Sequence, residues 1–259
     1  MTAVSGSAKY PKIRLFDIRK ACSTCSLREL CLPVGLGRED TEALERIIEQ
    51  SRPLRKGDRL CSLGQPFTTL HVVYSGSLKS ITVDHNGKDQ VIAFHLPGEL
   101  VGLDAIGADR HPSTIEALET TSVCKLPFVH LEELARQIPG LQRQLLRIMS
   151  KEIFDDHELL QVVARRKAEQ RLAILLLSLS QRFARRGLSR TRFRLSMSRH
   201  DLGNFLGLAP ETTSRVFKRF MELGWLKVSG KEIELLDLAA LQGMTAKPET
   251  TPLEAGGGR

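Results

Sequence analysis

Three of the five cysteines of this chain fall within ten residues, in the stretch CSTCSLRELC at positions 22–31. The thiols of Cys22, Cys25 and Cys31 can hold a zinc ion or an iron–sulfur cluster, or they can close disulfides. An odd total of cysteines argues against a disulfide framework, and cytosolic thiols are kept reduced. The N-terminal sequence has no apolar signal segment, so we expect a cytoplasmic protein. The stretch therefore favours metal binding.

The other two cysteines, Cys61 and Cys124, stand alone further along the chain. Zinc ribbons usually pair two CxxC halves, whereas a cubane iron–sulfur cluster accepts one distant thiolate as its fourth ligand. Either cysteine can also be an ordinary core residue. Spacing alone therefore leaves zinc and iron–sulfur open and does not choose the fourth ligand.

The length of 259 residues is sufficient for two domains, and 41% hydrophobic with 26% charged residues is typical of a soluble globular protein. The longest apolar run, LAILLLSL at 172–179, is far shorter than the roughly 20 residues of a membrane span. We therefore expect no membrane association.

The positive charge is concentrated near the C-terminus. From Arg165 to Lys231, sixteen basic residues minus four acidic ones give +12, so the rest of the chain carries −4 of the total of +8. A basic module attached to a mildly acidic body is typical of a nucleic-acid-binding domain joined to another domain.

The segment from Leu54 to about Leu126 consists of short apolar runs separated by glycine-containing turns. The dipeptide Asn86-Gly87 between two alternating runs predicts a tight hairpin. The pattern predicts an antiparallel β-roll or jelly roll. Helical periodicity precedes it at 41–51 and follows it at 128–138.

A long helix is predicted over 139–167. Its apolar stripe alternates steps of three and four residues, which is the pattern of a helix seam that pairs with a second helix. The seam contains Met149, Ile153 and Leu160, and Asp156 is its single acidic member. The seam predicts a homodimer.

Two short helices and a two-stranded wing are predicted after a further helix at 168–186. Ser198 is a candidate N-cap of the first short helix, and Pro210 fits the first position of the second. In such a winged helix-turn-helix, the start of the second helix meets base edges in the major groove of double-stranded DNA. Glu211, Ser214 and Arg215 lie at this start. They are candidate DNA-binding residues, because Glu can accept a hydrogen bond from cytosine and Arg can donate two to guanine.

The predicted fold class is therefore α+β, with an N-terminal cyclic-nucleotide-binding-like β-roll, a long dimerisation helix and a C-terminal winged helix-turn-helix. The expected divisions are a cysteine-rich segment at 1–35, the roll at 36–138, the helix at 139–167, the DNA-binding domain at 168–240 and a disordered tail at 241–259.

This order of elements resembles the Crp–Fnr family of regulators, and four stretches are similar to its oxygen-sensing branch. They are FHLPGELVGLDAIG at 94–107, ALETTSVCKLPF at 117–128, FRLSMSRHDLGNFLGL at 193–208 and ETTSRVFKRF at 211–220. The resemblance covers the chain from about Cys22 to Leu236.

The resemblance implies that Cys124 is the fourth ligand and that Cys22, Cys25, Cys31 and Cys124 hold an oxygen-labile 4Fe–4S cluster. It also implies RNA polymerase as a partner, and a palindromic TTGAT-type site read by the E-x-x-S-R signature at 211–215. Cyclic-nucleotide-binding members carry an Arg-Ser or Arg-Thr pair where this chain has His111-Pro112, so no cyclic nucleotide is expected.

Two other functions are weighed against an oxygen-responsive regulator. A cupin-type metal enzyme needs clustered histidines, and the histidines of the roll lie on separate elements, so we expect no enzyme. A Crp-type regulator that senses another small effector and holds a structural zinc, or no metal, is the alternative.

Overall fold

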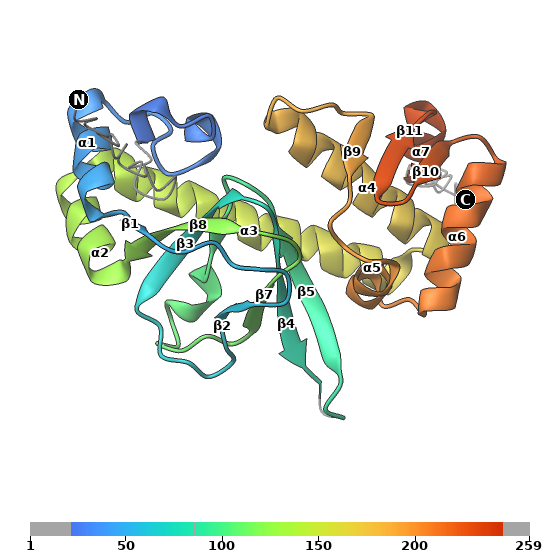
Figure 1. Ribbon diagram of the computed structural model, residues 1–259, viewed down its shortest axis with the longest axis horizontal. Coiled ribbons are helices and arrows are strands. Elements are labelled where there is room, and N and C mark those ends of the chain that lie inside the picture. Colours follow the sequence, from blue (N-terminus) through green and yellow to red (C-terminus); the bar gives the residue numbers. More distant parts are fainter. Residues whose placement is uncertain (1–21, 85, 246–259) are drawn as a thin grey trace, which may run out of the picture.

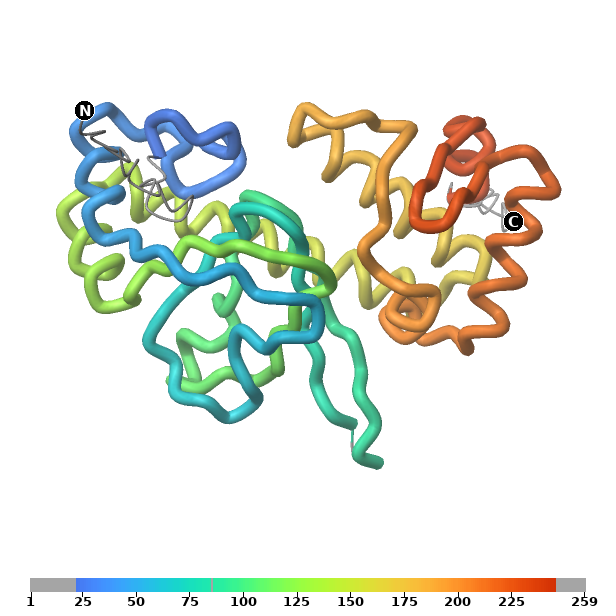
Figure 2. The backbone as a smooth tube through the Cα atoms, viewed as in Figure 1, coloured from blue at the N-terminus to red at the C-terminus, as the bar shows by residue number. Residues whose placement is uncertain are grey.

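The computed structural model describes residues 22–84 and 86–245. A β-roll lies at one end of the molecule and a helical domain with a small sheet at the other, and the long helix α3, Pro139–Arg165, connects them (Figure 1). The cysteine segment, drawn in blue, lies beside the first turns of the long helix (Figure 2).

The roll contains two four-stranded antiparallel sheets with the orders β1-β8-β3-β6 and β2-β7-β4-β5. Their strands are β1 Glu49–Gln50, β2 Arg59–Cys61, β3 Thr69–Ser75, β4 Leu78–Val83, β5 Asp89–His95, β6 Leu100–Val101, β7 Thr114–Ala117 and β8 Ser122–Pro127. The predicted hairpin is confirmed, because β4 pairs with β5 and Gly87 between them has a φ of 76°.

Two helices flank the roll. Helix α1 spans Arg38–Ile47 and α2 spans Phe128–Gln137. The helix predicted at 41–51 ends earlier, because Gln50 pairs with Cys124 of β8 as part of a sheet. Short 3-10 turns lie at Cys22–Thr24, Arg28–Leu30 and Leu103–Ala105.

Helix α3 spans Pro139–Arg165, with the proline in its first turn, and α4 spans Ala168–Arg185. The prediction of one long helix followed by an amphipathic helix is confirmed.

The C-terminal domain contains the two predicted short helices, α5 Arg199–Leu206 and α6 Pro210–Glu222. The wing has three strands instead of the predicted two, in the order β10-β11-β9. They are β9 Arg192–Arg194, β10 Leu226–Ser229 and β11 Glu232–Leu235. The predicted tail begins too early, because α7 spans Leu238–Thr245 and buries Leu241; residues 246–259 lie outside the described part.

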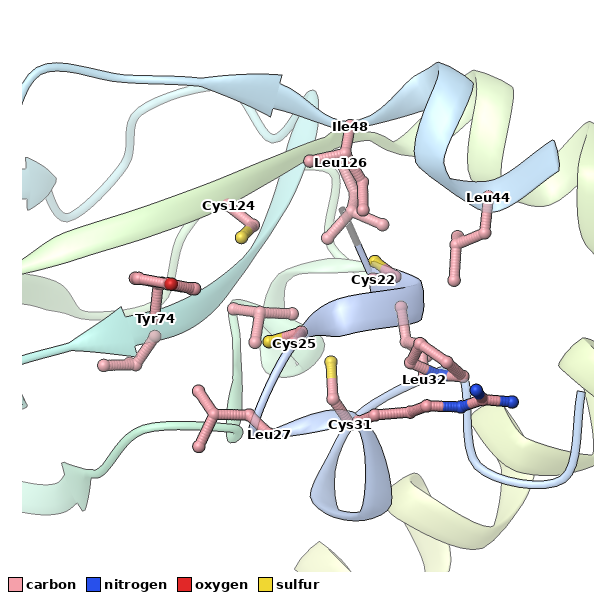
Figure 3. Close-up of a pocket in the computed structure, with 14 residues that line it drawn as sticks. Cys22, Cys25, Leu27, Cys31, Leu32, Leu44, Ile48, Tyr74, Cys124 and Leu126 are labelled. Atoms are coloured by element: carbon pink, nitrogen blue, oxygen red, sulfur yellow. The ribbon is translucent and has the colours of Figure 1, made fainter. Parts of the chain in front are cut away.

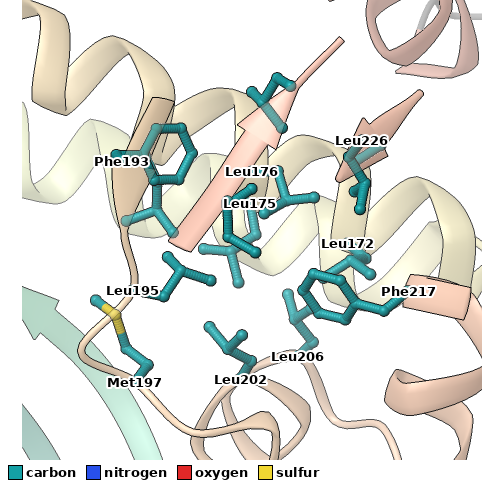
Figure 4. Close-up of a cluster of buried hydrophobic side chains, with 14 of the residues drawn as sticks. Leu172, Leu175, Leu176, Phe193, Leu195, Met197, Leu202, Leu206, Phe217 and Leu226 are labelled. Atoms are coloured by element: carbon teal, nitrogen blue, oxygen red, sulfur yellow. The ribbon is translucent and has the colours of Figure 1, made fainter. Parts of the chain in front are cut away.

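The largest apolar core fills the C-terminal domain between α4, α5, α6 and the wing (Figure 4). It also includes side chains of the roll, namely Val91, Phe94, Leu96 and Leu118. The rings of Phe94 in β5 and Phe205 in α5 have centroids 5.0 Å apart. The roll and the C-terminal domain therefore pack against one another across a shared core.

Candidate metal centre and nucleic-acid interface

Successive tight turns bring the three clustered cysteines together. The backbone amide of Cys25 donates to the carbonyl of Cys22 at 3.2 Å, that of Arg28 to Cys25 at 3.1 Å, and that of Cys31 to Arg28 at 3.4 Å. The carboxylate of Glu45 in α1 accepts a hydrogen bond from the amide of Ser23 at 2.7 Å. Three consecutive turns of three residues thus connect Cys22 with Cys31. The bond to Glu45 holds the first of these turns against helix α1.

Cys124 of β8 completes this group. It lines one pocket together with Cys22, Cys25 and Cys31, and the four sulfur atoms point into the same space (Figure 3). The remaining lining is mostly apolar, and it consists of Leu27, Arg28, Leu32, Pro33, Leu44, Ile48, Val72, Val73, Tyr74 and Leu126. The structure thus brings together the four cysteines that the resemblance selects.

The pocket disfavours thiolate charge when no cation is present. Burial, followed by the negative charges of Cys124, Glu45 and Cys25, raises the pKa of Cys22 to about 12. The pKa of Cys31 is also about 12, chiefly through burial, with Cys22, Cys124 and Cys25 adding to the rise and a hydrogen bond to the backbone of Leu32 lowering it. A metal would supply the positive charge that these thiolates need.

The thiols influence one another electrostatically. Within residues 22–84 and 86–245, no three His, Cys, Asp or Glu side chains are placed to hold one metal ion. Cys61 lies apart from this pocket, buried in the core of the roll among Val73, Leu78 and Ile115.

The recognition residues predicted on α6 lie on its outer face. Glu211, Ser214 and Arg215 are exposed, whereas Thr213 and Phe217 on the inner face are buried. Arg215 places a guanidinium nitrogen 3.4 Å from the hydroxyl oxygen of Thr212 rather than on Glu211. All three side chains therefore face solvent on the outer side of α6.

The turn between α5 and α6 fixes the angle at which α6 is presented. The Ser198 hydroxyl accepts from the amide of Asp201 at 3.0 Å, which confirms Ser198 as the N-cap of α5. A methyl group on Gly203 would lie 2.7 Å from the Thr213 hydroxyl oxygen, so only glycine permits this helix contact. Gly207 ends α5 in the left-handed conformation.

The seam of α3 is open along most of its length. Of its residues, Leu146, Ile153 and Leu160 are 59%, 56% and 68% exposed. Phe154, which lies next to the seam and was not predicted as part of it, is 62% exposed. Met149 is half-buried, and Asp156 is exposed. The structure therefore leaves an apolar stripe uncovered on α3.

Sequence reasoning missed three polar residues that connect these parts. Glu99 forms ion pairs with Arg182 of α4 at 2.5 Å and with Arg186, the C-cap residue of that helix, at 2.6 Å. The sequence signal for Glu99 was a single acid in a turn, and its partners follow more than eighty residues later.

Comparison with known proteins identifies the two folded parts. Residues 51–138 match the cyclic nucleotide-binding domain, and residues 170–244 match the Crp-like helix-turn-helix domain. The transcriptional activator protein Anr of Pseudomonas protegens is 48% identical over 225 residues, which cover 86% of this chain and 92% of that protein. This chain belongs to the Crp–Fnr family.

Two further proteins are similar to this chain over most of its length. The fumarate and nitrate reduction regulatory protein of Salmonella typhi is 44% identical over 227 residues, covering 86% of this chain and 91% of that protein. The structure of FixK2 from Bradyrhizobium japonicum covers 77% of this chain and 99% of its own, with a TM-score of 0.71 and 28% identity. These relatives confirm the predicted fold, and they confirm the class of a DNA-binding regulator rather than an enzyme.

In the part of the chain that the structure describes, no helix has the length and apolarity that crossing a bilayer requires.

Proposed function

We propose that this chain is a cytoplasmic transcriptional activator that binds DNA as a dimer while its four pocket cysteines hold an oxygen-labile 4Fe–4S cluster. One observation carries the proposal: Cys124, ninety-three positions beyond Cys31, lines the same apolar pocket as the three clustered cysteines. Four thiols in one apolar pocket are the donor set that such a cluster requires.

The donor set fits this group. Burial and mutual electrostatic repulsion raise the pKa of Cys22 and Cys31, so a cationic centre is needed to stabilise their thiolates. A cubane cluster takes one thiolate for each of its four iron atoms, which is the number of cysteines in the pocket. When bound, the cluster would supply the reactivity toward oxygen.

The residues around the pocket hold the ligands in place and exclude water. Leu32 and Leu44 are buried in the core cluster that Cys31 and Cys124 pack against. The side-chain amide of Gln144 in α3 donates to the Cys31 carbonyl at 3.3 Å, so the ligand segment is bonded to the helix that bears the seam. A change in the conformation of the cysteine segment can therefore shift α3 through this hydrogen bond.

The uncovered stripe of α3 supports a homodimer. Four large apolar side chains that are more than half exposed on one helix favour association with a second copy. Two copies would present two α6 helices to half-sites about one DNA turn apart, which suits a palindrome.

We propose that Glu211, Ser214 and Arg215 read a TTGAT-type half-site and that the activator works through RNA polymerase. Their exposure on α6 supports base contact. We propose no cyclic nucleotide as effector, because His111 and Pro112 stand where a phosphate clamp would need an arginine and a hydroxyl side chain, and His111 is buried beside Phe67.

Purification without oxygen tests the cofactor. Iron and sulfide near four per chain, with a visible absorption band lost in air, are expected for the wild type. Cys124→Ser should lose the band, and Cys61→Ser, the matched control, should keep it. Colourless protein with about one zinc per chain would instead support a regulator of another effector.

A further inference from the structure

The turn at Gly98 and Glu99, between β5 and β6, lies between the cysteine segment and the DNA-binding domain. One side of it meets the residues between Cys25 and Cys31, and the other side meets α4. Neither contact involves the seam of α3.

The contact with the cysteine segment is tight. A methyl group built on Gly98 would lie 3.0 Å from Cβ of Leu30 and 3.8 Å from Cβ of Leu27. The φ of Gly98 is 89°, a conformation that side-chain-bearing residues rarely adopt. The two leucines therefore pack directly on the backbone, with no flexible side chain between them to absorb a displacement.

The turn is also bonded to the wall of the cysteine pocket. The amide of Gly98 donates to the carbonyl of Val73 at 2.8 Å, and the amide of Val73 donates to the carbonyl of Glu99 at 3.0 Å. Val73 lines the pocket with the four cysteines. Two separate contacts thus connect the pocket with Gly98 and Glu99.

On the other side, the turn accepts a set of charged hydrogen bonds from α4. Arg182 donates to both carboxylate oxygens of Glu99, at 3.1 Å and 2.5 Å, and to the Phe94 carbonyl at 2.6 Å. Arg186 donates to the carboxylate at 2.6 Å and to the Pro97 carbonyl at 2.7 Å. The Arg186 side chain is only 6% exposed, so moving the turn would leave a buried charge without its partner.

We propose that Gly98 and Glu99 form a coupling turn, through which the packing of the cysteine segment sets how the DNA-binding domain docks on the roll of the same chain. Glu99 is a positioning residue in this device. The coupling is a property of the chain itself; its role in sensing rests on the proposed function, in which a cluster orders the segment.

The rest of the domain interface supplies a matched control. Glu119 also joins the roll to the DNA-binding domain, by an ion pair of 2.7 Å with Arg194 on the wing strand β9. Glu119 follows β7 and is not part of the turn that meets Leu27 and Leu30. Removing either carboxylate weakens docking, but only removal of Glu99 should disconnect docking from the cysteine segment.

The test is a double-mutant comparison by amide hydrogen exchange of α4 and α5 in the full chain without iron. Leu30→Ala should speed exchange in α4 about threefold or more, a coupling of the size found between residues in contact. In the Glu99→Gln background, Leu30→Ala should add nothing. In the Glu119→Gln background, it should have its full effect.

Equal acceleration by Leu30→Ala in both backgrounds, or none in the wild type, would overturn the proposal. Should Glu99→Gln fail to fold, Arg182→Gln replaces it; because Arg186 still holds the carboxylate, the effect of Leu30→Ala should then be reduced rather than abolished, and an undiminished effect would overturn the proposal. Iron content is measured separately on anaerobic protein, and Glu99→Gln should match the wild type. A chain that never binds iron would refute the proposed cofactor, while the exchange result would still decide the coupling.

Discussion

The side-chain amide of Gln144 donates a hydrogen bond of 3.3 Å to the backbone carbonyl of Cys31, which lies 113 positions earlier in the chain. Gln144 is on the second turn of α3 and is only 9% exposed. Leu146, two positions later, is on the uncovered seam. One turn of helix therefore contacts both the cysteine pocket and the surface proposed for the dimer.

Replacing Gln144 by leucine should loosen the cysteine segment. The Cys31 carbonyl would lose one of two donors and keep the Val34 amide at 3.3 Å, at a cost of about 0.5–1.5 kcal/mol in the free energy of unfolding. Urea unfolding of the iron-free chain measures this cost. In a separate experiment on anaerobically purified protein, the visible absorption of Gln144→Leu should be lost in air faster than that of the wild type. Gln142→Leu, on the exposed face of the same helix, is the control. Equal stability of Gln144→Leu and Gln142→Leu would show that the bond contributes nothing.

Replacing Asp156 by alanine should strengthen the dimer. Burial, the neighbouring Asp155 and the more distant Asp104 raise the pKa of this carboxyl, while His157 lowers it. Facing its twin across a two-fold axis, the ionised carboxylate would oppose pairing. The dimer dissociation constant in air should fall about tenfold or more, equivalent to about 1.4 kcal/mol. Sedimentation velocity measures it.

Asp155→Ala is the matched control for that experiment, because Asp155 is ion-paired with Lys151 on the same helix. It should leave the dissociation constant near the wild-type value. An Asp156→Ala chain that remains monomeric in air would mean that this carboxylate does not hold the copies apart.

Replacing Arg215 by alanine should relax sequence discrimination at one guanine position by about 1–3 kcal/mol. Binding to matched and mismatched operators, measured across a salt series, separates this effect from phosphate contact. Lys218→Ala provides the comparison, because Lys218 is exposed one turn further along α6. It should weaken both operators about equally. Equal losses on both operators for Arg215→Ala would assign that residue to the phosphate backbone.

The free energy of unfolding should fall at acid pH as the Glu99 carboxylate becomes protonated. Burial alone would raise the pKa of this carboxyl, but Arg182, Arg186 and the Leu96 amide outweigh it and hold the pKa at about 2. Because the folded value lies below the ordinary 4.5, the contribution of Glu99 is complete above about pH 4.5 and is lost as the pH falls toward 2.

Between pH 6 and pH 3, the iron-free wild type should therefore lose on the order of 2 kcal/mol more unfolding free energy than Glu99→Gln. Urea titrations at each pH provide the comparison. Arg182→Gln should flatten the profile in part, because Arg186 still pairs with the carboxylate. Parallel profiles for the wild type and Glu99→Gln would contradict the ion-pair assignment.

Features encoded by neighbouring residues could be predicted. The Asn86-Gly87 turn and the Ser198 cap depend on backbone and side-chain preferences within a few positions, and both are present. The apolar spacing on α3 likewise defines its exposed stripe. The three clustered cysteines needed only local turns to come together.

Features that depend on distant partners could not be predicted. Strand β9 is only three residues long and becomes a strand by pairing with β11, about forty positions later. Gln144 is a polar residue on a helix, a pattern that usually indicates solvent, and its partner Cys31 lies on another element. Cys61 and Cys124 were equal candidates by spacing alone. The fold of the roll distinguishes them, because the Cys124 side chain lines the pocket whereas the Cys61 side chain is buried in the core of the roll.

The core that joins Phe94, Leu96 and Leu118 of the roll to α4 and α5 restricts how this protein can be divided. A cut after Arg166, between α3 and α4, would expose these side chains on one fragment and their partners, such as Leu172 and Phe205, on the other. Grafting the DNA-binding domain onto a different sensor therefore requires redesign of both surfaces. Because the roll and the DNA-binding domain share one apolar core, neither can be exchanged by itself without exposing buried side chains of the other.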